Sequence, residues 1–159
     1  MNKRAIVSKI VDKLSGELDT CLRAAQFARA EATHEQNKAE NKYDTRGLEA
    51  SYLASGQSKQ AHELALSIRE FQALLAKPLP DSPVIGLGSL VQVDAAGERS
   101  WYFLGPRAGG TEILHDRKEI LVITPQSPLG SKLCGNCVGS QVTLGEGRES
   151  RTARVLQVQ

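Results

Sequence analysis

The segment EQNKAENKYDTR, residues 35–46, is polar with no apolar run and lies between two long stretches of helical periodicity. Before it, apolar or small residues recur at alternating steps of four and three, which is the spacing of a coiled-coil seam. They are Val7, Val11, Leu14, Leu18, Cys21, Ala25, Ala28 and Ala32. The same spacing recurs after it, at Ala50, Ala54, Gln57, Ala61, Leu64, Ile68, Phe71 and Leu75. The sequence therefore predicts two helices joined by a polar turn.

The two seams mirror each other about the polar segment. Facing residues of an antiparallel helix pair have position numbers with a constant sum, and here 7 with 75, 21 with 61 and 32 with 50 each sum to 82. This symmetry places Asn41 at or near the apex of the turn. The seam is made of small residues near that turn, so the two backbones are expected to approach closely. At about 1.5 Å per residue, arms of roughly 30 residues extend about 45 Å, which predicts a slender hairpin that reaches into a partner.

The composition limits the function classes open to this chain. It has 159 residues, of which 40% are hydrophobic, and a net charge of +2, too small to bind nucleic acid through bulk electrostatics. No apolar run approaches the roughly 20 residues that span a bilayer, so no membrane partner is expected. Lys9, Asp12 and Lys13 interrupt any signal-peptide core. We expect a cytoplasmic protein.

The pattern changes after the segment Lys77–Pro80, where two prolines end the second helix. We expect a hairpin over 1–77, a Pro-rich linker over 78–83 and a second domain over 84–159. Short apolar runs between glycine turns predict the strands of this domain. They lie at 90–93, 99–104, 112–114, 120–123, 141–144 and 152–158. With one short helix capped by Ser127 and begun by Pro128, the fold class is α+β, a helical hairpin followed by a small antiparallel sheet domain.

Other residues capable of chemistry have simpler explanations. The three cysteines are an odd number, which argues against a disulfide framework. Cys134 and Cys137 form a CxxC motif that is compatible with metal or redox chemistry, but no further ligands lie nearby and a structural role is the alternative. The three histidines lie on different predicted elements, and no catalytic set of nucleophile, base and orienting residue is recognisable. We expect no enzymatic activity and no cofactor bound by the chain alone.

The polar turn is the best candidate site, because loops on a rigid scaffold often carry function. It holds carboxylates and amides whose oxygens suit Mg²⁺, a hard cation that usually accepts one or two protein carboxylates. A merely soluble turn remains the alternative. The candidate tip residues are Glu35, Asn37, Glu40, Asn41, Tyr43, Asp44 and Arg46.

The segment from Ile123 to Val142, ITPQSPLGSKLCGNCVGSQV, resembles a signature of the Gre transcript-cleavage factors almost position for position. That signature reads Ser-Pro-[Ile/Leu]-[Ala/Gly]-x-x-Leu-x-Gly-x-x-x-Gly-[Asp/Ser]-x-Val. Residues 40–43, ENKY, also resemble the Glu-Asn-Ala-Glu-Tyr of the Gre finger. In this alignment Cys134 and Cys137 replace an apolar residue and a lysine. The likeness covers the C-terminal half well and implies a coiled-coil finger followed by an FKBP-like domain.

The resemblance implies that the chain binds bacterial RNA polymerase and inserts its tip through the secondary channel. Ser127, Pro128 and Leu129 would belong to the docking surface, and contacts with transcript RNA and DNA would be indirect. Two acids at the tip of a Gre factor help to hold a catalytic Mg²⁺ of the polymerase, which then hydrolyses its backtracked RNA. Glu40 and Asp44 would share that ion only in the complex.

One departure leaves the activity open, because the first tip acid of the family aligns with Asn37, which carries no charge. The chain is therefore either a factor that stimulates cleavage or a secondary-channel inhibitor without cleavage activity. A prolyl isomerase of the FKBP type and a plain interaction module are the rival classes.

Overall fold

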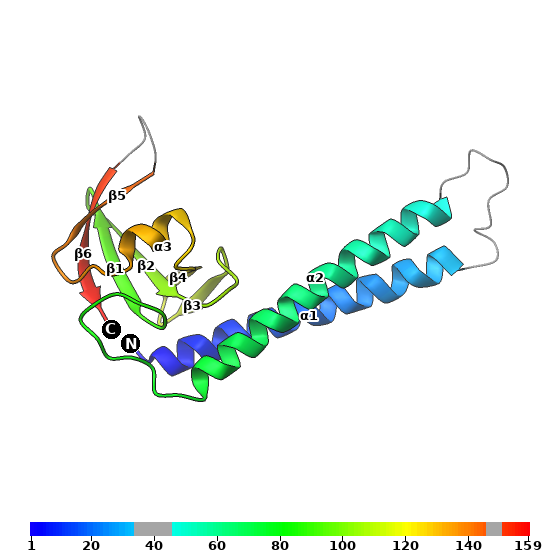
Figure 1. The fold of residues 1–159 in the computed structure, drawn as a ribbon, viewed down its shortest axis with the longest axis horizontal. Helices are drawn as coiled ribbons and strands as arrows, with labels where there is room; N and C mark the ends of the chain where they lie inside the picture. Colours follow the sequence, from blue (N-terminus) through cyan, green and yellow to red (C-terminus); the bar gives the residue numbers. More distant parts are fainter. Residues whose placement is uncertain (34–45, 146–150) are drawn as a thin grey trace. The chain divides into compact units, whose positions relative to one another are not determined.

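The computed structural model describes residues 1–33, 46–145 and 151–159 (Figure 1). Its N-terminal part consists of helices α1 (Lys3–Thr33) and α2 (Arg46–Leu75), which run antiparallel beside each other. None of the helices in this described part combines the length and apolar character that a bilayer span requires. The predicted pair of long helices is confirmed, with ends close to those expected from the polar segment and the prolines.

Burial along the helices follows the predicted seam. The side chains of Leu14, Cys21, Ala25, Ala28, Ala54 and Ala61 are buried, and those of Leu18, Gln57 and Leu64 are partly buried. Residues between these positions are exposed, with few exceptions. The seam is thus the stripe of each helix that packs against the other, as its 3.5-residue period requires.

The chain divides into two compact units. One is the hairpin over residues 12–68, and the other joins residues 1–11 to residues 69–159. The start of α1, up to residue 11, and the end of α2, from residue 69, therefore pack with the sheet and are called the helix roots below. The domain boundaries expected at 77 and 84 stay a prediction, because this division follows packing rather than the course of the chain.

The second unit contains one six-stranded sheet in the order β3-β4-β2-β1-β6-β5. Its strands are β1 (Leu90–Ala95), β2 (Glu98–Leu104), β3 (Glu112–His115), β4 (Lys118–Ile123), β5 (Gln141–Leu144) and β6 (Arg151–Val158). Neighbours are antiparallel except β2 and β4, which are parallel because the chain crosses over from the end of β2 to β3 at the sheet edge. The short helix α3 (Pro128–Leu133) follows β4. The predicted α+β fold, a helical hairpin followed by a small sheet domain, is confirmed. The expectation of a wholly antiparallel sheet is wrong for the β2–β4 pair, because the chain passes through β3 before it returns beside β2.

Both faces of the sheet bury apolar side chains. One face forms a core with α3 through Ile85, Val91, Val93, Leu104, Ile123, Leu133, Val142, Ala153 and Val155. On the other face, the ring centroids of Phe103 and the α2 residue Phe71 are 6.5 Å apart, and both side chains are fully buried. Because side chains alternate along a strand, Trp101 and Phe103 share this face while Tyr102 lies on the other. The expectation that these three aromatics cannot all share a face is confirmed.

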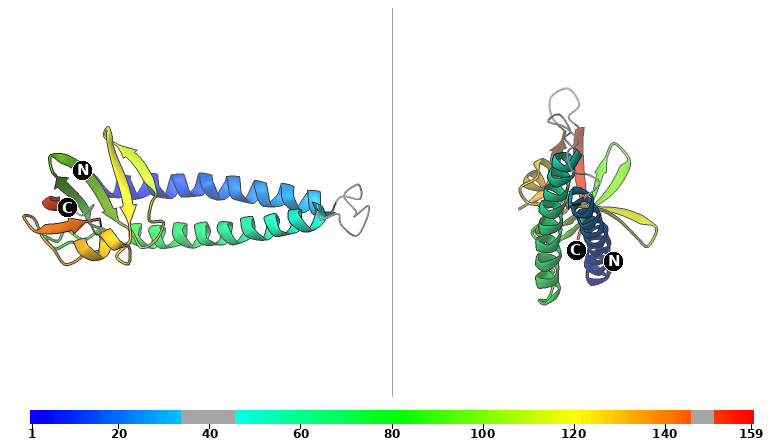
Figure 2. Two further views of the ribbon diagram at one scale, coloured as in Figure 1. Left: turned by 90° about the horizontal axis from the view of Figure 1, so that it is seen from above. Right: turned by 90° about the vertical axis from the view of Figure 1, so that its right-hand side faces the viewer.

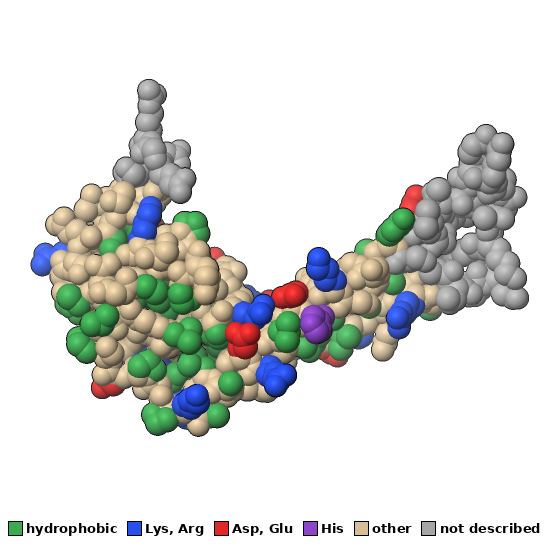
Figure 3. Space-filling model, in the orientation of Figure 1, with side chains coloured by type: hydrophobic (Ala, Val, Ile, Leu, Met, Phe, Trp, Pro, Cys, Tyr) green, Lys and Arg blue, Asp and Glu red, His purple; other side chains and the backbone are tan. Residues whose placement is uncertain are grey.

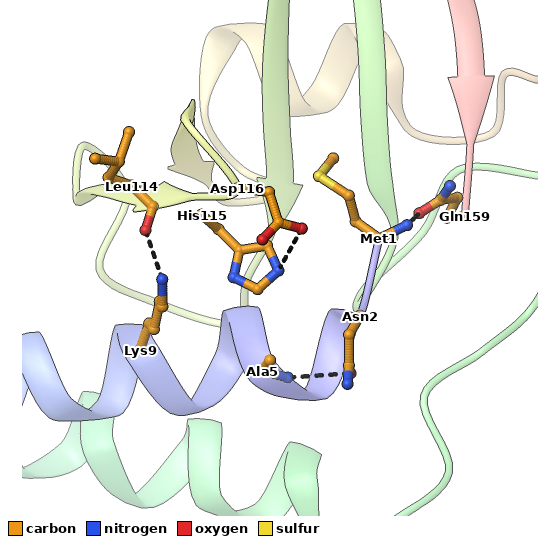
Figure 4. A network of polar contacts seen from close by, with 8 residues as sticks. All are labelled: Met1, Asn2, Ala5, Lys9, Leu114, His115, Asp116 and Gln159. Carbon is orange, nitrogen blue, oxygen red and sulfur yellow. Dashed lines mark hydrogen bonds and ion pairs between the residues drawn. The ribbon is translucent and has the colours of Figure 1, made fainter.

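Polar contacts fix the root of α1 to the sheet unit (Figure 4). Lys9 Nζ donates a hydrogen bond to the Leu114 carbonyl oxygen at 2.9 Å, and the Asn2 side chain caps the helix by accepting from the Ala5 N–H at 3.2 Å. The buried His115 ring lies between these contacts, with Nε2 3.4 Å from a carboxylate oxygen of Asp116. The first turns of α1 are therefore anchored through the Lys9 side chain, which donates to a backbone carbonyl oxygen of β3.

Candidate functional site

The hairpin brings the end of α1 at Thr33 and the start of α2 at Arg46 to the same end of the helix pair (Figure 1). In the sequence, the polar segment follows the first of these helix ends and ends at the second. Six of the candidate tip residues, Glu35, Asn37, Glu40, Asn41, Tyr43 and Asp44, lie outside the described residues. Arg46 is the first residue of α2, and only its backbone is described.

The seam of the hairpin contains a polar contact that the sequence did not suggest. The Cys21 thiol lies 3.0 Å from the backbone carbonyl oxygen of Gln57 and 3.2 Å from its side-chain Oε1. Gln57 is one helical turn from Ala61, the residue predicted to face Cys21. This contact is compatible with the predicted register, because a knob in a coiled coil touches residues of two adjacent turns on its partner.

Near the tip, the hairpin exposes large apolar side chains that lie off the seam. Phe27, Tyr52 and Leu53 are 71%, 70% and 57% exposed. Along the visible side of the hairpin, charged side chains of both signs alternate with apolar ones (Figure 3). The seam periodicity does not identify them, although aromatic residues between seam positions are a recognisable signal of an exposed apolar surface. Exposed apolar residues of this kind are frequent in interaction surfaces.

The residues predicted for docking form the N-terminus of α3. Ser127 is its N-cap, and its hydroxyl accepts a hydrogen bond from the Gly130 N–H at 3.0 Å while it donates one to the Thr124 carbonyl oxygen at 2.7 Å. Pro128 occupies the first turn, where its missing N–H and fixed φ cost little. The predicted cap and first helical residue are confirmed.

The other two residues of the Ser-Pro-Leu-Gly motif, Leu129 and Gly130, are explained by packing against the sheet. Leu129 packs against the sheet core, and a Cβ at Gly130 would lie 1.9 Å from the Thr124 carbonyl oxygen, which leaves room for glycine only. Pro128 is exposed, whereas Ser127 and Leu129 are partly buried. Of the three predicted docking residues, Pro128 therefore offers the most free side-chain surface, and the docking role itself stays a prediction.

Metal and thiol chemistry find little support in the described residues. Within them, no group of three or more His, Cys, Asp or Glu side chains is placed to hold a metal ion. The three thiols are free, and burial raises the pKa of Cys134, which keeps that thiol protonated at neutral pH. Cys134 packs against the core while Cys137 is exposed. Cys134 thus has the packing of a core residue, and the role of the CxxC motif stays a prediction.

No protein-family description matches the chain, and a comparison with curated proteins yields no match. Among solved structures, it is similar to the GreA factor homolog 1 (Gfh1) protein of Thermus thermophilus, with 23% identity, 94% of each chain covered and a TM-score of 0.39. Gfh1 of Thermus aquaticus gives 23% identity, 92% of each chain and a TM-score of 0.40. The prokaryotic transcription elongation factor GreA/GreB from Nitrosomonas europaea gives 20% identity, 58% of this chain, 78% of that chain and a TM-score of 0.37.

Proposed function

We propose that this protein is a transcription factor that binds bacterial RNA polymerase at its secondary channel and directs the hairpin tip toward the active site. The observation that carries the proposal is the paired-helix hairpin, whose small-residue seam holds α1 and α2 together and brings Thr33 and Arg46 to the same end of the pair. The second support is the Ser-Pro-Leu-Gly motif at the N-terminus of α3, where the sequence resembles the Gre signature.

At the tip, Glu40 and Asp44 would each supply a carboxylate oxygen to an Mg²⁺ ion that the polymerase holds. Carboxylates are the ligands this cation prefers, and the bound ion would polarise the phosphate and activate water. Asn37 contributes no charge. The chain itself would bind no cofactor and perform no reaction, and its contacts with RNA and DNA would arise only inside the elongation complex.

A stalled, backtracked elongation complex tests this function. Purified bacterial RNA polymerase is halted on a template, the protein is added, and transcript length is followed. Shortened RNA supports stimulation of cleavage, whereas slower synthesis without shortening supports a secondary-channel inhibitor. A variant that lacks residues 33–49 serves as the control, because it removes the tip and keeps the sheet unit. An unchanged affinity for polymerase in this variant, together with no effect of the intact protein on transcription, would exclude both activities.

The isomerase alternative has a separate test. Catalysis of proline isomerisation in a chromogenic peptide, at a rate well above the uncatalysed one, would favour an enzyme of the FKBP type. We expect no such catalysis, because a proline pocket needs several aromatic side chains and Phe103 is fully buried in the sheet packing.

A further inference from the structure

The sheet divides at one end into two separate hairpins (Figure 2). The parallel pairing of β2 with β4 begins only at Trp101 opposite Ile120, whereas β2 pairs with β1 from Glu98 onward and β4 pairs with β3 from Lys118 onward. The β1–β2 and β3–β4 hairpins therefore diverge and enclose a cleft of about 560 Å³. This volume lies within the range typical of ligand sites, roughly 300–1,000 Å³.

Backbone groups of β2 point into this cleft. Gly105 N–H donates to the Ile123 carbonyl oxygen on the β4 side at 2.9 Å, and Leu104 N–H donates to Ser89 on the β1 side at 2.9 Å. Successive residues of a strand direct their N–H and C=O groups to opposite sides. Arg99 is an even number of residues from Gly105, so its N–H and C=O also face the β4 side. At Arg99, however, β2 and β4 are no longer paired.

The β4 wall presents a matching group. Val122 N–H donates to the Thr111 carbonyl oxygen on the β3 side at 2.8 Å. By the same alternation, the Glu119 N–H faces β2. Because the described strands have separated here, the backbone groups of Arg99 and the Glu119 N–H have no strand partner. Unpaired backbone groups of this kind are the template to which another strand adds.

Charge divides the cleft into two faces. Glu98 and Glu119 stand on opposite walls but on the same face of the sheet, and neither is paired with a cation in the described part of the chain. The other face carries Lys118, whose Nζ lies 4.8 Å from the centroid of the Trp101 ring. The face with Glu98 and Glu119 is thus acidic, and the face with Lys118 is basic. Side chains two residues apart on a strand lie on the same face, because successive side chains alternate between the two faces.

We propose that this cleft binds an extended segment of a partner protein by strand addition, and that the segment carries cationic and anionic residues at alternating positions. Its backbone pairs with the free groups of Arg99 and Glu119. Its cations face Glu98 and Glu119, and its anions face Lys118. This inference does not depend on polymerase binding, because it concerns only residues within the sheet unit.

The test uses the full chain labelled with ¹⁵N and two synthetic peptides of equal length and composition. One peptide alternates Lys and Glu, and the other groups its Lys residues before its Glu residues. We expect the alternating peptide to shift the backbone amide signals of residues 98–100 and 117–119 and to slow hydrogen exchange at Arg99 and Glu119. The grouped peptide is expected to bind about tenfold more weakly, because it cannot satisfy both faces.

Charge reversal provides the matched controls. The variant E98K/E119K is expected to weaken binding of the alternating peptide by about tenfold, the order expected from losing two exposed ion pairs. Asp12→Lys makes the same kind of charge change on an exposed residue of α1 and is expected to leave binding unchanged. Each single reversal replaces the double variant if the latter does not fold. Equal binding of both peptides, signal changes away from the cleft, or no binding of the alternating peptide would overturn the proposal.

Discussion

The Cys21 thiol donates a hydrogen bond to the Gln57 backbone carbonyl oxygen at 3.0 Å, across the seam between α1 and α2. The thiol and this oxygen are in direct contact, so a larger side chain directed the same way would overlap the Gln57 backbone. We expect Cys21→Leu to lower the free energy of unfolding by about 1–3 kcal/mol through overpacking, measured by urea unfolding with the helical circular dichroism signal. Cys21→Ser, nearly the same size and still a donor, is the control. Equal stability of the two variants would show that the seam is loosely packed at this level.

Gly16 is expected to lower the stability of α1, because glycine has a low helix propensity and no packing contact requires it at this position. It lies inside α1, and a Cβ at this position would meet no atom within 4 Å. Gly16→Ala should therefore raise the free energy of unfolding by about 1 kcal/mol, the difference in helix propensity. Thermal unfolding measures the gain. Gly105→Ala is the opposite control, because its Cβ would lie 2.6 Å from the Phe71 ring; a gain in both variants would contradict the packing described here.

Gly130 makes the α3 motif sensitive to a single methyl group. Its Cβ would lie 1.9 Å from the Thr124 carbonyl oxygen, a backbone atom that cannot move without disturbing the Ser127 cap. We expect Gly130→Ala to destabilise the protein by about 3 kcal/mol, seen as a lower midpoint of urea unfolding. Ser131→Ala changes an exposed neighbour and should stay within about 0.5 kcal/mol of the parent. A mild effect of Gly130→Ala would mean that α3 shifts freely on the sheet.

The two cysteines of the CxxC motif should differ in reactivity. Burial raises the pKa of Cys134, so its reactive thiolate forms only at higher pH, whereas Cys137 is exposed. We expect iodoacetamide to modify Cys137 first at neutral pH, as peptide mass spectrometry would show. Preferential modification of Cys134 would contradict its place in the core.

The raised pKa of Cys134 makes the stability of the protein depend on pH. A folded-state pKa above the unfolded one means that the native state binds the thiol proton more tightly, so this contribution is complete below the unfolded pKa and declines as pH rises through the folded value. Stability should therefore fall in alkaline solution. Cys134→Val, which has no proton to lose, should make that decline shallower in urea unfolding at several pH values. A decline of the same steepness in the variant would assign it to other groups.

If the tip lacks only one acid, restoring it should increase cleavage. Asn37→Asp is expected to stimulate shortening of backtracked RNA by about tenfold relative to the parent chain, the order of effect that one polar group near a metal commonly has on metal affinity. Glu40→Gln should have the opposite effect. Gel analysis of the transcripts measures both, and Lys59→Gln on the exposed side of α2 is the control. No change in either tip variant would show that the tip does not reach the ion.

The hairpin was largely predictable because its information is local and periodic. The spacing of Leu14, Cys21 and Ala25 specifies a buried stripe whatever the rest of the chain does, and burial follows that stripe closely. The strands, the Ser127 cap and the role of Pro128 were predictable for the same reason, since each depends on a few neighbouring residues. The docking residues were identified by resemblance alone and the tip residues by the polar turn together with the resemblance, and the roles of both sets stay predictions.

The remaining features required tertiary structure, because they join residues that are distant in sequence. Periodicity along β2 and β4 predicts two strands, but only their pairing partners show that β2 and β4 run parallel and separate before Trp101. No local pattern shows that Phe71 packs on Phe103, or that Gly130 faces a carbonyl oxygen. Local sequence is enough to predict the helices, the strands and the helical hairpin, because backbone hydrogen bonding and side-chain periodicity act over a few residues. The cleft and the packing of the helix ends on the sheet follow only from long-range contacts, because these depend on where the chain returns.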